Sequence, residues 1–181
     1  METWLPRLLI TSEITPWHDW LITGGSLSER IRQRCGKAFR VQPVFQGRAP
    51  ARPDELARLH LPPGSCPLVR EVVLLNGNTP LVFARSLASV DDLDGPWRGL
   101  RGLGSRPLAT MLFADPGIRR GNLEFRKLSK RSALHACASK TITTLPDQLW
   151  ARRSIFVRCG APLMVMEAFL PGILELDFRH R

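Results

Sequence analysis

Pro67–Ser89, with the sequence PLVREVVLLNGNTPLVFARSLAS, has the pattern of two β-strands joined by a tight turn at Asn76–Gly77–Asn78. Alternate side chains of a strand point to opposite faces, so Arg70 and Arg85 each interrupt an apolar stripe. The planar guanidinium of arginine matches the two oxygens of a carboxylate. Each of these arginines is therefore a candidate for binding a carboxylate, whether from the protein or from a ligand.

A carboxylate occurs in a second apolar stretch, PLMVMEAFLP (Pro162–Pro171), which is typical of a buried strand. Glu167 shares one face with Leu163, Val165 and Phe169, and the other face is apolar as well. A buried carboxylate is costly unless a cation or hydrogen-bond donors compensate it. Two readings stay open: a structural salt bridge between Glu167 and Arg70 or Arg85, or a site built to hold a polar ligand.

The rest of the chain predicts helices first and then strands that pair mostly as hairpins. Ser26 and Glu29 fit a capping box at the start of a helix that ends at Gly36. The other expected elements are a helix over Thr15–Ile22, an edge strand over Phe39–Gln46, short helices within Leu93–Gly117, a strand over Leu123–Leu128, and a strand over Trp150–Cys159 that turns back into the Glu167 strand. This order predicts an α+β fold with an antiparallel sheet, in a single domain of 181 residues.

Composition excludes several classes of protein. The net charge of +10 is spread along the chain without a nucleic-acid-binding motif, which indicates a solvated surface that also attracts small anions. No apolar run is long enough for a membrane span, and the N-terminus lacks the pattern of a signal peptide. Four scattered cysteines indicate reduced thiols of a cytoplasmic protein, and four dispersed histidines predict no metal site.

Four segments resemble the chorismate pyruvate-lyase family. They are LVREVVLLNGNTPLVFARS (Leu68–Ser86), LGSRPLATMLF (Leu103–Phe113), WARRS (Trp150–Ser154) and APLMVMEAFLP (Ala161–Pro171), within a similarity that runs from about Trp17 to Pro171. Members of this family convert chorismate to 4-hydroxybenzoate and pyruvate at the start of ubiquinone synthesis. The resemblance implies a single antiparallel sheet flanked by helices, in a monomer without metal or cofactor.

The resemblance also implies roles for individual residues. Arg70 matches the arginine that binds the ring carboxylate, and Glu167 matches the glutamate that meets the 4-hydroxyl group. Arg85 matches a second site arginine, suited to the enolpyruvyl carboxylate. Leu108 matches a residue whose backbone helps to hold the ligand, and Leu27 stands where the family often has methionine. On this reading Glu167 and Arg70 hold opposite ends of one aromatic acid and need not touch.

Two further expectations follow. A site that fits both ends of 4-hydroxybenzoate releases it slowly, with the segments near Leu27 and Leu108 as lids. The main alternative is a non-catalytic domain that senses a small aromatic acid, because the same fold resembles effector domains of bacterial transcription regulators.

Overall fold

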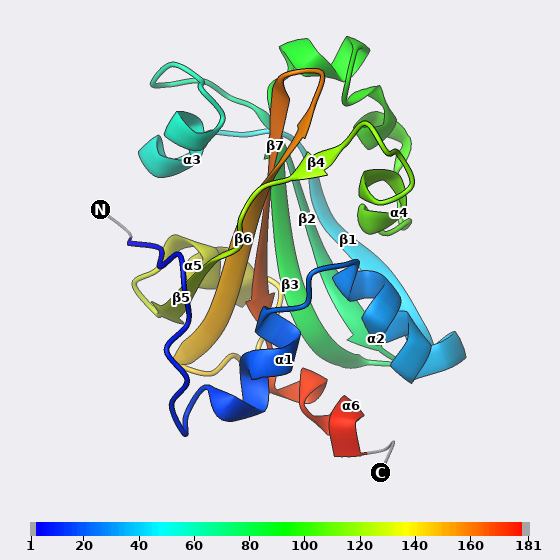
Figure 1. The fold of residues 1–181 in the computed structure, drawn as a ribbon, viewed down its shortest axis with the longest axis vertical. Helices are drawn as coiled ribbons and strands as arrows, with labels where there is room; N and C mark the ends of the chain where they lie inside the picture. The colour runs from blue at the N-terminus through cyan, green and yellow to red at the C-terminus, as the bar shows by residue number, and fades with distance from the viewer. Residues whose placement is uncertain (1–2, 179–181) are drawn as a thin grey trace.

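An antiparallel sheet occupies the centre of the molecule (Figure 1), as the strand pattern predicts. The computed structural model describes residues 3–178, and within them seven strands pair in the order β1-β2-β3-β7-β6-β4, with β5 also pairing β6. The strands are β1 (Phe39–Arg48), β2 (Leu68–Asn76), β3 (Thr79–Ala88), β4 (Arg119–Arg120), β5 (Glu124–Ser129), β6 (Gln148–Arg158) and β7 (Ala161–Phe169).

Two hairpins build the middle of the sheet. β2 and β3 turn through Gly77, which has φ +59°, and β6 and β7 turn through Cys159 and Gly160, which have φ +50° and +81°. Such positive φ angles suit the tight two-residue turns that join antiparallel strands. The hairpins pair along β3 and β7, so the strand that carries Glu167 lies beside the strand that carries Arg85.

The β2–β3 pairing contains an irregularity that matters for the site. Leu75 pairs with Pro80, whereas Leu74 pairs with Val82, so Leu81 is an extra residue on β3. A β-bulge of this kind shifts the register by one residue, and a one-residue shift moves every later side chain to the other face of its strand.

Helices cover both faces of the sheet. They are η1 (Thr15–Trp17), α1 (His18–Leu21), α2 (Leu27–Cys35), η2 (Gly36–Ala38), α3 (Pro53–Arg58), η3 (Asp91–Asp94), η4 (Arg98–Gly102), α4 (Ala109–Leu112), α5 (Ala133–Ser139), η5 (Pro171–Ile173) and α6 (Glu175–Phe178). In Figure 1, α1 and α2 lie in front of the sheet, on what we call the α2 face, and α5 lies behind it, on the α5 face. Within residues 3–178, no helix is long and apolar enough to cross a membrane.

The predicted start of α2 is confirmed. The Ser26 hydroxyl accepts a hydrogen bond from the Glu29 backbone N–H at 3.1 Å, and the helix ends where Gly36 adopts φ +56°. The expected helix over Thr15–Ile22 divides into η1 and α1. Several elements had not been predicted, among them α5, in a polar and mixed segment, β4, which is only two residues long, and η5 and α6, which follow β7.

Apolar side chains pack differently on the two faces. On the α5 face one continuous cluster joins Met164 and Ala168 of β7 to Leu134 and Ala138 of α5. The α2 face instead has two clusters, one around Trp20 and one around Trp97. The candidate site lies between these two clusters.

Candidate active site

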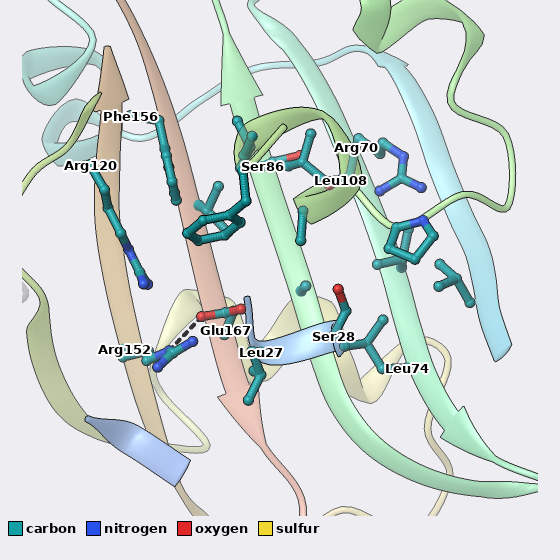
Figure 2. Close-up of a pocket in the computed structure, with 18 of the residues that line it drawn as sticks. Leu27, Ser28, Arg70, Leu74, Ser86, Leu108, Arg120, Arg152, Phe156 and Glu167 are labelled. Carbon is teal, nitrogen blue, oxygen red and sulfur yellow. Dashed lines mark hydrogen bonds and ion pairs between the residues drawn. The ribbon is translucent and has the colours of Figure 1, made fainter. Parts of the chain in front are cut away.

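A cavity opens on the α2 face, where the sheet is covered by α2 and by the segment that leads into α4. The empty space between its walls is about 610 Å³, counting the part of its mouth that is open to solvent. Figure 2 shows Arg70 at one side of the cavity and Glu167, Arg152 and Arg120 at the other.

Arg70 projects from β2 into this cavity and is 4% exposed. Its Nη2 donates hydrogen bonds to the carbonyl oxygens of Gly104 and Arg106, both at 3.0 Å. Its Nε is buried without a hydrogen-bond partner in the described chain, and burial lowers the pKa of Arg70. A buried cation with an unused donor is suited to bind an anion, because a charge-assisted hydrogen bond would compensate its desolvation.

Glu167 faces the same cavity from β7, but its salt-bridge partner is neither Arg70 nor Arg85. Nε of Arg152 on β6 donates to Oε2 of Glu167 at 2.5 Å, and the Arg152 side chain is 1% exposed. The structural salt bridge considered from the sequence was therefore assigned to the wrong arginines. A signal was present in the sequence, because the two-residue turn at Cys159–Gly160 sets Arg152 directly opposite Glu167 in a regular hairpin.

Arg152 also binds the main chain that precedes α2. Its Nη1 donates to the carbonyl oxygens of Trp20, Leu21 and Thr23 at 2.9–3.2 Å. Because one guanidinium holds both Glu167 and this segment, the carboxylate is fixed in position. Oε1 of Glu167 makes no hydrogen bond to any residue in the range 3–178, so it is available to a ligand.

Arg85 lies on the α5 face, outside the cavity, which corrects the expectation that it is a second site arginine. It is paired there with Glu55 of α3 at 3.1 Å and with Glu71 of β2 at 2.6 Å. Burial opposes the charge of Arg85, but Glu55 and Glu71 outweigh burial and raise its pKa. The cause of the difference is the bulge at Leu81, which places Ser86 and not Arg85 opposite Arg70.

Arg120 of β4 is a cavity residue that the sequence reasoning missed. Its Nε donates to the Ser154 hydroxyl at 3.0 Å, and its Nη1 donates to the Gly24 carbonyl oxygen at 2.9 Å. Burial and the neighbouring charge of Arg152 lower the pKa of Arg120 to about 10, and Glu167 partly opposes this shift. No periodic signal marks a strand of two residues, so the sequence offered no indication of this position.

The remaining predicted residues, Leu27 and Leu108, both line the cavity.

Arg70 and Glu167 do not touch, because β3 lies between their strands. Adjacent strands are about 4.8 Å apart, so the two backbones are separated by about 9–10 Å across the sheet. The cavity is therefore polar at two sides and apolar between them, where Val72, Ala84 and Val165 line it. In the described part of the chain, no group of three or more His, Cys, Asp or Glu side chains could hold a metal ion.

Two solved structures illustrate the similarity of the fold to known proteins. The effector domain of PhnF from Mycobacterium smegmatis aligns with a TM-score of 0.58 and 14% identity, over 82% of this chain and 90% of that one. The ligand-binding domain of a putative GntR-family transcriptional regulator from Bordetella bronchiseptica aligns with a TM-score of 0.53 and 15% identity, over 74% and 83%. At such low identity these likenesses concern the fold alone.

Sequence relatives are much closer. A protein from Nitrosospira multiformis named probable chorismate pyruvate-lyase is 42% identical over 176 residues, which cover 91% of this chain and 98% of the relative. A protein of the same name from Aromatoleum aromaticum is 45% identical over 180 residues, covering 97% and 95%. The sequence model of the family described as chorismate lyase matches residues 2–177. With a match over nearly its whole length, the chain belongs to the chorismate lyase family.

Proposed function

We propose that this protein converts chorismate to 4-hydroxybenzoate and pyruvate. The proposal rests on the two polar ends of the cavity. The Arg70 cation lies at one side, and Oε1 of Glu167, which has no hydrogen-bond partner within residues 3–178, lies at the other. The names of the sequence relatives support the same reaction.

The substrate matches this arrangement. The ring carboxylate and the 4-hydroxyl group of chorismate lie at opposite ends of its ring. Nε of Arg70 can donate to the carboxylate, and Oε1 of Glu167 can accept a hydrogen bond from the hydroxyl group. The ring then lies against the apolar strip of β2, β3 and β7, in contact with the side chains of Leu27 and Leu108.

The reaction needs no other reactant. The C3–O bond breaks and its electron pair leaves with the enolpyruvyl oxygen, while the proton on C4 is removed and the ring becomes aromatic. A proton is returned to the methylene carbon of the enolpyruvate, which gives pyruvate. Because aromatisation drives the step, the protein mainly orients the substrate and stabilises the developing charge. Glu167 holds the 4-hydroxyl group beside C4 and is placed to assist removal of that proton.

Product retention is part of the proposal. 4-Hydroxybenzoate keeps both groups that Arg70 and Glu167 bind, so its release, which requires movement of the segments around Leu27 and Leu108, limits turnover. We further propose that the protein acts as a monomer in the cytoplasm and supplies 4-hydroxybenzoate to ubiquinone synthesis.

The direct test is an absorbance assay for loss of chorismate with formation of 4-hydroxybenzoate. We expect turnover by the wild-type protein and a fall of about 100-fold or more in kcat/KM for both Glu167→Gln and Arg70→Ala. Near wild-type activity in both variants would remove the assigned roles. Tight binding of 4-hydroxybenzoate without turnover of chorismate would instead identify a sensing domain.

Retention of 4-hydroxybenzoate can be tested with progress curves of chorismate turnover. Progress curves should bend as 4-hydroxybenzoate accumulates, and adding the product at the start should lower the initial rate. Linear curves at product concentrations well above KM would exclude release as the limiting step.

A further inference from the structure

We propose that Arg120 is a further catalytic residue, which binds the enolpyruvyl carboxylate of chorismate and stabilises the negative charge of the departing enolpyruvate. This inference rests on the proposed function. Chorismate is a dianion, and Arg70 accounts for only one of its carboxylates. The enolpyruvyl ether is attached at C3, next to the C4 hydroxyl group, so the second carboxylate lies toward the Glu167 side of the cavity.

Few cations are available at that side. Arg152 is committed to Glu167 and to three main-chain carbonyl oxygens, and Arg85 is on the opposite face of the sheet. Arg120 remains, and Figure 2 shows its side chain extending along the cavity wall toward Glu167.

The charges of the cavity lead to the same residue. Glu167 offsets the charge of Arg152, so Arg70 and Arg120 leave a formal charge of two positives for a substrate with two negatives. Within residues 3–178, Arg120 forms no ion pair with a carboxylate, and its hydrogen bonds use only Nε and Nη1. Nη2 is left to donate to a ligand. A half-buried cation with this environment gains from an incoming anion.

The position of Arg120 is fixed before substrate arrives. Ser154 and the Gly24 carbonyl oxygen hold its guanidinium, which lies 5.3 Å from the centre of the Phe156 ring. Burial lowers its pKa to about 10, so the side chain is still charged at neutral pH. A preorganised cation of this kind stabilises charge that develops in the transition state without reorganising at the moment of reaction.

The role of Arg120 can be tested by comparing chorismate with 4-hydroxybenzoate, because only chorismate has the enolpyruvyl carboxylate. We expect Arg120→Gln to lower kcat/KM for chorismate by about 100-fold and to change the Kd for 4-hydroxybenzoate by less than about threefold. Arg70→Gln should weaken both. Arg119→Gln is the matched control, since Arg119 is the exposed neighbour on the same strand, and it should change neither. Arg120→Lys, which keeps the charge, should recover part of the lost activity.

Two outcomes would overturn the inference while the proposed function stands: wild-type kcat/KM in Arg120→Gln, or an equal loss of chorismate turnover and 4-hydroxybenzoate binding. The second outcome would assign Arg120 to the architecture of the cavity. Failure of the proposed function is distinguishable, because the wild-type protein would then not convert chorismate. Retained product binding in Arg120→Gln also shows that the variant is folded.

Discussion

Glu167 is stabilised by one arginine, and that arginine is stabilised in turn by the main chain. Arg152 donates one hydrogen bond to Glu167 and three to carbonyl oxygens before α2. Removing one member of a buried ion pair leaves the other charge uncompensated, which costs more than the pair contributes. The site thus depends on a side chain that need not touch the substrate.

We expect Arg152→Gln to lower the free energy of unfolding by about 3–5 kcal/mol, measured by urea denaturation. Glu167→Gln should cost less, because glutamine keeps the shape and can still accept from Arg152. The exposed pair of Arg101 and Asp94 offers a control, and Arg101→Gln should change stability by less than about 1 kcal/mol. Equal losses in Arg152→Gln and Arg101→Gln would contradict this account.

Arg120 gives the protein a specific dependence on pH. Its pKa is lowered from the ordinary arginine value to about 10 in the folded protein, so the folded state loses this proton before the unfolded state does. The cost of burying the charge is therefore present in full below pH 10 and is relieved as the pH rises through that pKa. By our proposal, binding of chorismate requires the positive charge of Arg120. As the pH rises above about 10, stability should therefore increase while kcat/KM for chorismate falls. That alkaline limb should be missing from the pH profile of Arg120→Gln, and its persistence there would assign it to another group.

Among the elements, the β2–β3 hairpin decides which arginine serves the cavity. Asn76 pairs with Thr79 and Leu75 with Pro80, and an uninterrupted ladder would go on to pair Arg70 with Arg85 on one face. The extra residue Leu81 turns Arg85 to the α5 face, where Glu55 and Glu71 neutralise it. Because of the bulge, Ser86 lines the cavity wall in place of Arg85.

Arg85→Gln should accordingly affect stability and not chemistry. Loss of the cation leaves two buried carboxylates unpaired, which we expect to lower the free energy of unfolding by about 3–5 kcal/mol. Assayed at a temperature where the variant is folded, kcat and KM should remain near the wild-type values. A large fall in kcat with unchanged stability would return Arg85 to the catalytic machinery.

The cavity arginines also hold the segments that cover the site. Arg70 binds carbonyl groups of the loop before α4, and Arg120 and Arg152 bind the linker before α2, at Thr23 and Gly24. The two arginines that we propose to bind the substrate, Arg70 and Arg120, therefore also hold the cover, whereas Arg152 holds the cover and Glu167.

The linker at Gly24–Gly25 can be tested as a hinge. A Cβ atom at either position would meet nothing within 4 Å, and neither glycine has a positive φ. Gly24→Ala and Gly25→Ala should stabilise the closed form by about 0.4–1 kcal/mol by restricting the open chain. We expect each to slow dissociation of 4-hydroxybenzoate about twofold to fivefold in stopped-flow measurements, without loss of thermal stability. Faster release would argue against a hinge at this linker.

At the scale of the whole molecule, the net charge of +10 matches a small anionic ligand better than a polymer. Three of the arginines line a single cavity, and within residues 3–178 no long basic helix gathers the others. A positive field raises the rate at which an anion meets its site, and salt weakens that field. The association rate of 4-hydroxybenzoate should fall several-fold between about 0.01 and 0.15 M ionic strength, over which the Debye length shortens from about 30 to 8 Å. An association rate independent of salt would show that the surface charge has no part in capture.

Features that depend on neighbours along the chain could be predicted from the amino-acid sequence. Alternation placed Arg70 and Glu167 on buried faces, the turn signals defined both hairpins, and Ser26 marked the start of α2. Which charged groups meet became clear only in the folded chain. A single extra residue, Leu81, sent Arg85 to the other face, and two residues of β4 brought Arg120 into the cavity. Local periodicity carries no information about such encounters, because they depend on register and on packing between segments as far apart in sequence as Arg152 and Trp20.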